Sequence, residues 1–273
     1  MLPFLIASLI LLALGYASFR RGRSLKQELL IIKGTEVANL VDLQSLVRHV
    51  AGEMGGGAYR ERVALSGTVR CETPLEAPLS QQQCVYYKTQ ITEKYKALRT
   101  VKDSHGNRRK EWKTGRETLS KDEIQTPFIL DDPSGQILVQ PHGFGIEGIE
   151  VVERFEPAGT TNLAGSGGSG DRPEVTFTPR HDSRYRTLGY HYREEILPLG
   201  TCVYLLGELT DEGRRLMVRS PSSPPSGIIT HRSQQAIIGS KEGRLRKTHI
   251  FSTGFFVVSF GVLIYGLYHV LST

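Results

Sequence analysis

The chain has 273 residues, a net charge of +6 and three cysteines. Three cysteines without a close pair exclude a disulfide-rich framework and leave a single Cys71–Cys84 bond as an open alternative. The basic residues form no stripe with interleaved aromatic side chains, so we expect no nucleic-acid partner.

The first predicted element is an apolar run at the start of the chain. Residues 2–18 carry no charge and are close to the roughly 20 residues that cross a bilayer as a helix. The sequence therefore predicts a transmembrane helix over 2–19. A cleaved signal peptide is the alternative, but no basic segment precedes the run, and Ala13 to Ser18 makes a poor cleavage site.

Residues 20–59 are expected to form a basic juxtamembrane segment followed by an amphipathic helix. Apolar residues recur at three- and four-residue steps over 36–54, Thr35 suits the N-cap, and three glycines follow the helix. Such a helix usually packs on its own domain. Lying in a membrane interface is the less favoured alternative.

Strands dominate residues 60–232, where Val63, Leu65 and Val69 alternate with polar residues. The expected fold class is α+β and strand-rich: a mainly antiparallel sheet or partly closed barrel, with one N-terminal amphipathic helix and two flanking transmembrane helices. Two segments are expected to be flexible inserts, the charged residues 101–122 and the Gly- and Ser-rich residues 157–173.

The last elements are a second basic juxtamembrane segment, 233–248, and a second transmembrane helix, 249–271. Residues 250–268 are uncharged and have no polar face. Basic residues border both spans on the domain side, which predicts a two-span integral membrane protein with its domain in the cytoplasm. A domain on the periplasmic or intermembrane side is the alternative. Lipid head-group contacts are expected from Arg20, Arg21, Arg23, Arg244, Arg246 and Lys247.

The sequence offers little catalytic chemistry. It contains no CxxC, HExxH, GxSxG or P-loop, and its cysteines and histidines lack the close pairs typical of zinc sites, so no catalytic residue, metal or cofactor is expected. One group forms a candidate interaction or structural cluster: Tyr86, Tyr87, Tyr192, Glu194 and Glu195. Turn chemistry accounts for Asp131, Gly135, Pro198 and Gly200.

Three stretches resemble a known family in order along the chain. They are VALSGTVRCETPLEAPLSQQQCVYYKTQITE, PFILDDPSGQILVQPHG and YREEILPLGTCVYLLGE, and they span about residues 60–232. They are similar to the GIDE domain, also called BAM for "beside a membrane", of the MULAN-type mitochondrial RING E3 ubiquitin ligases and their plastid and bacterial relatives. The resemblance implies a domain that senses or recruits protein partners.

The sequence departs from the eukaryotic ligases after the second apolar run, where five residues, His269 to Thr273, stand in place of a RING. The arrangement resembles the bacterial, cyanobacterial form. We therefore expect a membrane-anchored, non-enzymatic protein-interaction or scaffold module with an unidentified protein partner and the lipid bilayer as partners. The alternatives are a ligase component with a RING supplied in trans, and a membrane-bound small-ligand binder or enzyme.

Overall fold

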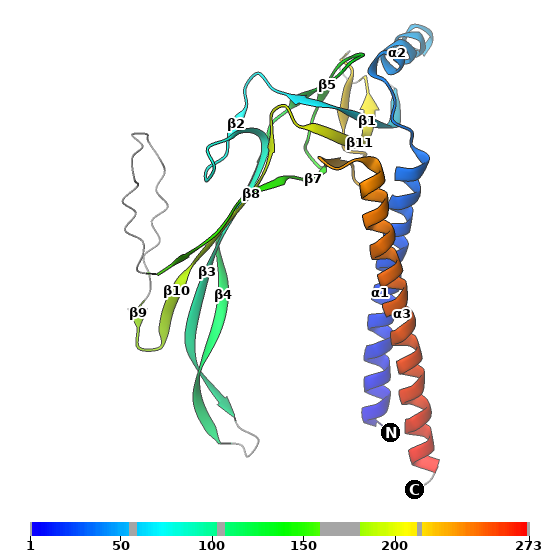
Figure 1. Ribbon diagram of the computed structural model, residues 1–273. Helices are drawn as coiled ribbons and strands as arrows, with labels where there is room; N and C mark the ends of the chain where they lie inside the picture. The colour runs from blue at the N-terminus through cyan, green and yellow to red at the C-terminus, as the bar shows by residue number, and fades with distance from the viewer. Residues whose placement is uncertain (1, 55–58, 103–106, 159–180, 212–214, 272–273) are drawn as a thin grey trace. The chain divides into compact units, whose positions relative to one another are not determined.

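The computed structural model (Figure 1) describes residues 2–54, 59–102, 107–158, 181–211 and 215–271. The chain divides into two compact units, each assembled from separate stretches of sequence. The first comprises Met1–Thr68, Ile129–Ile146 and Cys202–Thr273, and the second comprises Val69–Phe128 and Glu147–Thr201.

The first unit contains a closed barrel of five strands in the order β1-β5-β6-β12-β11, because β11 also pairs with β1. β6 and β12 run parallel, whereas β11 is antiparallel to both β1 and β12. Two further strands, β13 and β7, extend the sheet beyond β11. The strands are β1 (Arg60–Arg70), β5 (Phe128–Asp132), β6 (Gly135–Val139), β7 (Gly145–Glu147), β11 (Cys202–Thr210), β12 (Met217–Arg219) and β13 (Ile228–Thr230).

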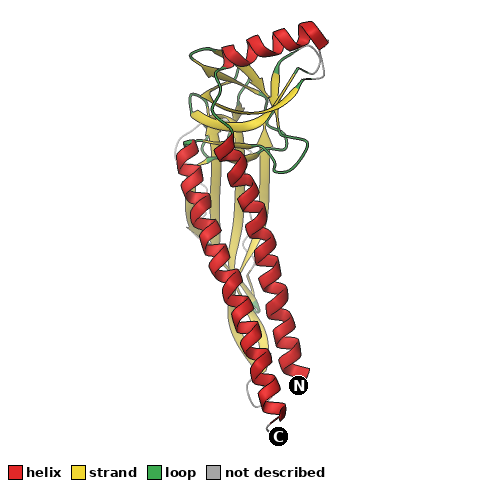
Figure 2. Cartoon of the chain, turned by 90° about the vertical axis from the view of Figure 1, so that its right-hand side faces the viewer, coloured by secondary structure: helices red, strands yellow, loops and turns green. Residues whose placement is uncertain are grey.

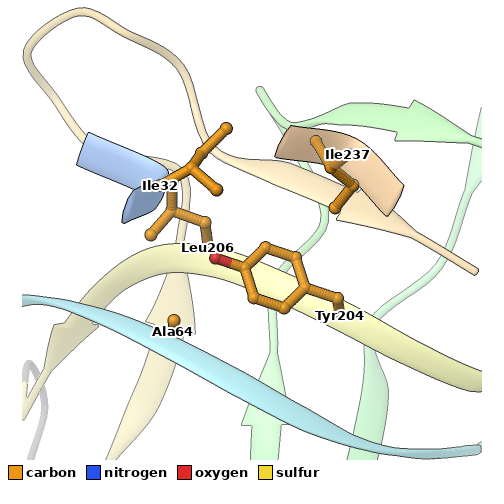
Figure 3. Packing of buried hydrophobic residues seen from close by; sticks show 5 residues of the cluster. All are labelled: Ile32, Ala64, Tyr204, Leu206 and Ile237. Carbon is orange, nitrogen blue, oxygen red and sulfur yellow. The ribbon is translucent and has the colours of Figure 1, made fainter. Parts of the chain in front are cut away.

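The barrel strands bury apolar side chains on both of their faces. Leu65 lies opposite Leu205, and both are fully buried on the face that closure turns inward. Ala64 lies opposite Leu206 on the other face. Helices α1 (Leu2–Gly34) and α3 (Gln234–Leu271) cover that outer face with Ile32 and Ile237, as Figure 3 shows. The expected alternation in β1 is therefore present, but both faces are covered.

Helices α1 and α3 lie side by side as an antiparallel pair (Figures 1 and 2). Small polar side chains lie at the contact: the Ser8 and Ser259 hydroxyls are 3.0 Å apart, and Ser252 donates to the Gly15 carbonyl at 3.3 Å. The outward faces expose large apolar side chains. Near the barrel, Lys241 and Glu28 form an ion pair at 2.5 Å. The pair thus combines buried hydroxyls with charged turns.

Among the described residues, no helix has both the length and the apolar character needed to cross a bilayer. The two predicted transmembrane helices, and with them the two-span integral membrane protein with a cytoplasmic domain, are therefore wrong. The apolar runs belong to longer helices that continue through charged turns, to Gly34 in α1 and from Gln234 in α3.

The second unit is an open, antiparallel half-barrel in which β3 and β10 form the centre. β4 and β2 pair with one edge of β3, and β8 and β9 pair with the far edge of β10. The strands are β2 (Leu75–Glu76), β3 (Gln83–Lys102), β4 (Arg108–Gln125), β8 (Ile149–Pro157), β9 (His181–Asp182) and β10 (Tyr185–Pro198). Residues 101–122 lie largely in the paired strands β3 and β4 and are not the flexible insert that we expected. Most of the expected insert 157–173 lies outside the described residues.

The predicted fold class is therefore wrong in two respects. The strands form two sheets in two units, a closed five-stranded barrel and a half-barrel, in place of one sheet or one partly closed barrel. The flanking helices do not meet the requirements of membrane spans. The barrel also contains one parallel pair, β6 with β12, which the expectation of a mainly antiparallel sheet allows.

Helix α2 (Leu40–Met54) is the predicted amphipathic helix, but it begins later than expected. Thr35 donates to the Ile31 carbonyl at the end of α1 and does not cap α2. The cap comes from the β5–β6 turn instead, where the Asp132 carboxylate accepts from the Leu40 amide at 3.3 Å and the Ser134 hydroxyl from the Val41 amide at 3.2 Å. A distant turn thus fixes the start of α2.

Candidate functional site

The candidate cluster predicted from the sequence lies on the two paired central strands of the open sheet. Its tyrosines Tyr86 and Tyr87 are in β3, and its other members are in β10. The register places Glu194 opposite Thr89, Glu195 opposite Lys88 and Tyr192 opposite Ile91. Because side chains alternate along a strand, Glu194 and Glu195 lie on opposite faces. The structure therefore divides the cluster between two faces of one sheet.

Glu194 is fully buried and has an extensive set of donors. Its carboxylate accepts from the Leu79 and Ser80 amides, both at 2.8 Å, and from the Thr89 hydroxyl at 3.2 Å. The two amides lie in the connection between β2 and β3, more than 110 residues earlier in the chain. A buried charge with three donors acts here as a structural anchor for that connection.

The other members of the cluster each have a different partner. The Tyr86 hydroxyl donates to Glu123 in β4 at 3.0 Å and does not reach either predicted glutamate. Burial, followed by this hydrogen bond, raises the pKa of Tyr86. The Arg154 guanidinium lies 5.1 Å from the centre of the Tyr192 ring. Glu195 lies near Arg193 at 3.7 Å. These contacts tie each of these members to a different neighbour in the open sheet.

A second buried carboxylate, Glu93, was missed from the sequence. It is 5% exposed and accepts from the Tyr185 hydroxyl at 3.0 Å and the Thr187 hydroxyl at 2.5 Å. The Tyr185 ring stacks on Tyr95 with centroids 4.7 Å apart. The signal in the sequence was the alternation around Glu93 in β3, which puts this carboxylate on the same face as the apolar Ile91.

Of the predicted turn residues, Gly200 has a left-handed backbone, with φ of 75°, between β10 and β11. Pro198 ends β10, and Gly135 starts β6 close to Leu40 of α2. Asp131 lies within β5, and its neighbour Asp132 forms the turn by accepting from Ser134 and Gly135 amides at 2.7 and 2.8 Å. Hydrogen bonds lower the pKa of Asp132 although burial alone raises it.

The basic residues expected at lipid head groups are all exposed on α1 and α3: Arg20, Arg21, Arg23, Arg244, Arg246 and Lys247. The structure does not test their contact with lipid, which stays a prediction. Cys71, Cys84 and Cys202 are all free thiols. Within the described residues, no three His, Cys, Asp or Glu side chains come together as a metal site.

The most distinctive surface of the open sheet is the two-stranded ribbon formed by the distal parts of β3 and β4. β10 pairs with β3 as far as Ala97, and from Arg99 to Lys102 β4 is the one strand among the described residues that pairs with β3. Nearly every β4 side chain is exposed, including Trp112 at 47%. The sequence analysis missed this ribbon because it took the charged residues 101–122 for a flexible insert.

One face of the ribbon carries basic side chains along most of its length. Directly paired residues share a face, so this face consists of successive cross-strand pairs at alternate positions. We call it the basic face and define it by the pairs Thr92–Thr118, Lys94–Arg116, Lys96–Thr114, Leu98–Trp112, Thr100–Lys110 and Lys102–Arg108, the first three of which lie where β3 also pairs with β10. It carries six basic side chains, and none of the twelve described residues that define it is acidic.

A model of the GIDE family, described as an E3 ubiquitin ligase, matches residues 98–264, more than half of the chain. The chain belongs to the GIDE family. The match begins within the ribbon and continues through both units to α3. The predicted resemblance is thus confirmed at the level of the family, although the matched range starts and ends later than the motifs suggested. Comparison with curated proteins and with solved structures gave no match.

Proposed function

We propose that the chain is a non-enzymatic, partner-binding module of the GIDE E3 ubiquitin ligase family, and that its β3–β4 ribbon contacts the partner. Membership of a ligase family supports a role in selecting proteins. The observation that carries the proposal is the ribbon itself, which extends past the last β10 pairing at Ala97.

The ribbon adds little to the core of the open sheet. A two-stranded ribbon is only marginally stable by itself. Burial stabilises a fold only where it removes apolar surface from water. Trp112 is 47% exposed, and only Gly115, Ser120 and Gln125 of β4 are even half-buried. A protruding pair of strands with an exposed tryptophan is therefore better explained by binding than by folding, since tryptophan is enriched at binding hot spots.

Site-specific photo-crosslinking tests the proposal in the full chain. A benzoylphenylalanine replaces either Trp112 on the ribbon or Ile124, which lies on the same strand and is 45% exposed. We expect a discrete adduct with one protein from position 112 that is absent from position 124 and is competed by excess unlabelled chain. The same adducts from both positions, or none from position 112, would contradict the proposal.

The non-enzymatic part of the proposal has its own experiment. The three cysteines lack the close pairs of ligands that a zinc-binding RING requires. With an activating enzyme, a conjugating enzyme and ubiquitin, we expect the chain alone to form no ubiquitin conjugates. Chain-dependent conjugation with no other ligase present would overturn this part and leave the crosslinking result to decide the role of the ribbon.

A further inference from the structure

We infer that the basic face of the ribbon binds an extended acidic peptide segment of a partner protein, with one large apolar side chain of that segment on Trp112. The inference rests on the proposed function, because it names the chemical class of the partner. It comes from the arrangement of charge and apolar surface along the six cross-strand pairs, which neither family membership nor the candidate cluster supplies.

The two faces of the ribbon differ in charge. The basic face has Lys94, Lys96, Lys102, Arg108, Lys110 and Arg116. The opposite face, formed by the pairs Glu93–Glu117, Tyr95–Gly115, Ala97–Lys113, Arg99–Glu111 and Val101–Arg109, has three basic and three acidic residues. A ribbon that needed charge only for solubility, or to block edge-to-edge pairing, would place mixed charges on either face. The segregation therefore indicates an anionic partner on one face.

The basic face also has an apolar centre. Leu98 and Trp112 form one cross-strand pair, with two charged pairs on each side of it along the ribbon. Trp112 is the single tryptophan of the chain and is 47% exposed. An aromatic anchor surrounded by a charged rim is the usual anatomy of a small protein interface. The partner segment should therefore have an apolar side chain flanked by carboxylates on both sides.

The spacing of the cross-strand pairs along the basic face matches the side-chain spacing of an extended peptide. Alternate residues of a strand lie about 6.6–6.8 Å apart on one face. Alternate side chains of an extended peptide have the same repeat, so carboxylates at every second position can meet successive basic pairs. Arg186 of β10 pairs with Lys96, is exposed and adds a positive charge beside the same row.

Nucleic acid fits this surface less well. Single-stranded nucleic acid is bound through several aromatic side chains on which successive bases stack. Trp112 is the one aromatic residue in the six pairs of the basic face. A duplex groove around the ribbon would also bring phosphates near Glu111 and Glu117 on the opposite face. The observations thus favour a protein segment, and nucleic acid becomes an outcome of the test.

The test uses the full chain and fluorescein-labelled peptides, with binding followed by anisotropy at low salt. The probe is TETETLTETET, which in extended form puts four glutamates and the leucine on one face. One control peptide has glutamine at every glutamate position. A second, TEETTLTTEET, has the same composition but divides its glutamates between both faces. We expect binding of the probe, roughly tenfold weaker binding of the glutamine peptide, and severalfold weaker binding of the second control.

Two triple variants localise the binding. Lys96→Gln, Lys110→Gln and Arg116→Gln remove three charges from the basic face, and Arg99→Gln, Arg109→Gln and Lys113→Gln remove three from the opposite face. We expect roughly tenfold weaker probe binding for the first and a change within about twofold for the second. Trp112→Ala should weaken binding by about tenfold. Circular dichroism and thermal unfolding check that each variant is folded.

Several results would overturn the inference. They are equal loss in both triple variants, no discrimination among the three peptides, and tighter binding of a twenty-nucleotide oligothymidine through the same residues. The photo-crosslinking experiment at position 112 distinguishes failure of this inference from failure of the proposed function. If the adduct at position 112 persists in the basic-face variant, the ribbon binds a partner but the charge assignment is wrong.

Discussion

The barrel and the open sheet bury different kinds of side chain. Along the described barrel strands, the buried side chains are apolar apart from the hydroxyl-bearing Tyr204 and Thr210, and none is charged; Leu65, Leu130 and Leu205 are among the largest. The open sheet buries two glutamates, Glu93 and Glu194, at the same depth as its tyrosines. Closing a sheet into a barrel removes its free edges, and apolar packing inside the barrel is then enough to hold the strands together. An open sheet lacks such closure, and here hydrogen-bonded carboxylates join its strands to its loops.

The difference has a consequence for binding. The barrel contacts α1 and α3 through a covered outer face, whereas the described part of the open sheet ends in the edge strand β4, with exposed side chains along its length. Edge strands and the surfaces next to them are where proteins add partners. The unit that depends on polar anchoring is thus also the one that presents the basic face.

The largest expected effect is in the barrel. Leu205→Ala removes most of a fully buried side chain on the strand that closes it, at its pairing with Leu65. We expect a loss of about 2–5 kcal/mol in the free energy of unfolding, from lost transfer energy and the cavity left behind. Urea denaturation measures the loss, and hydrogen exchange should show it in β1 and β11. A loss below about 1 kcal/mol would mean that closure does not bury this position.

Glu194→Gln should have the next largest effect, in the open sheet. It replaces a charged acceptor of three hydrogen bonds by a neutral one, which we expect to cost about 1–3 kcal/mol. Glu195→Gln is the matched control, since that side chain is 28% exposed and about 0–1 kcal/mol is typical of such pairs. Equal unfolding free energies for the two variants would break the proposed contrast between barrel and sheet.

Asp132→Ala tests a polar contact in the barrel unit, where α2 is capped from the β5–β6 turn. The folded-state pKa of Asp132 is lowered, so its contribution is present above the unfolded-state pKa and is lost as pH falls through the folded pKa. We expect the substitution to cost about 0.5–2 kcal/mol at neutral pH and less at pH values well below about 3.9. Urea unfolding at several pH values measures the difference in unfolding free energy between the unaltered chain and the variant. A difference that stays constant or grows as the pH falls would contradict this role of the Asp132 carboxylate.

Local patterns predicted much of the strand content. Alternation around Val63 and Leu65 identified β1, and turn chemistry at Asp131 and Gly135 matches the turn between β5 and β6. The family was also recognisable from three short motifs. The closure of the barrel could not be predicted from the sequence, because the pairing of β1 with β11 joins residues more than 130 positions apart. Hydrophobic periodicity indicates which face of a strand is buried, but it does not indicate which other strand pairs with it.

The candidate site was predicted less well than the strands. The sequence placed tyrosines and glutamates on neighbouring strands, but it could not show that Glu194 bonds the Leu79 and Ser80 amides or that Tyr86 donates to Glu123. The basic face was readable in principle, since Lys94 and Lys96 alternate in β3 and Lys110 and Arg116 share their face. Charge density was taken as a sign of flexibility, although charged residues are ordinary in an exposed ribbon.

The smallest expected effect concerns the reactivity of the cysteine thiols. Measuring it compares the two units without a substitution in either. Cys202 begins β11 and is exposed, whereas Cys84 is fully buried against Ala77 and Ile196 in the open sheet. Burial, with a smaller contribution from nearby Glu194, raises the pKa of the Cys84 thiol to about 11. Because the thiolate is the reactive form, we expect an alkylating reagent near pH 8 to modify Cys202 first and Cys84 only on unfolding.

Mass spectrometry of timed samples gives the order of modification, and the Glu194→Gln variant sharpens its meaning. If polar anchoring holds the open sheet together, this variant should expose Cys84 to the reagent sooner while leaving the rate at Cys202 unchanged. Glu195→Gln should leave both rates unchanged, because its carboxylate lies on the other face. Early modification of Cys84 in the unaltered chain would mean that the β2–β3 connection opens without loss of Glu194, and that its hydrogen bonds do not set the local stability.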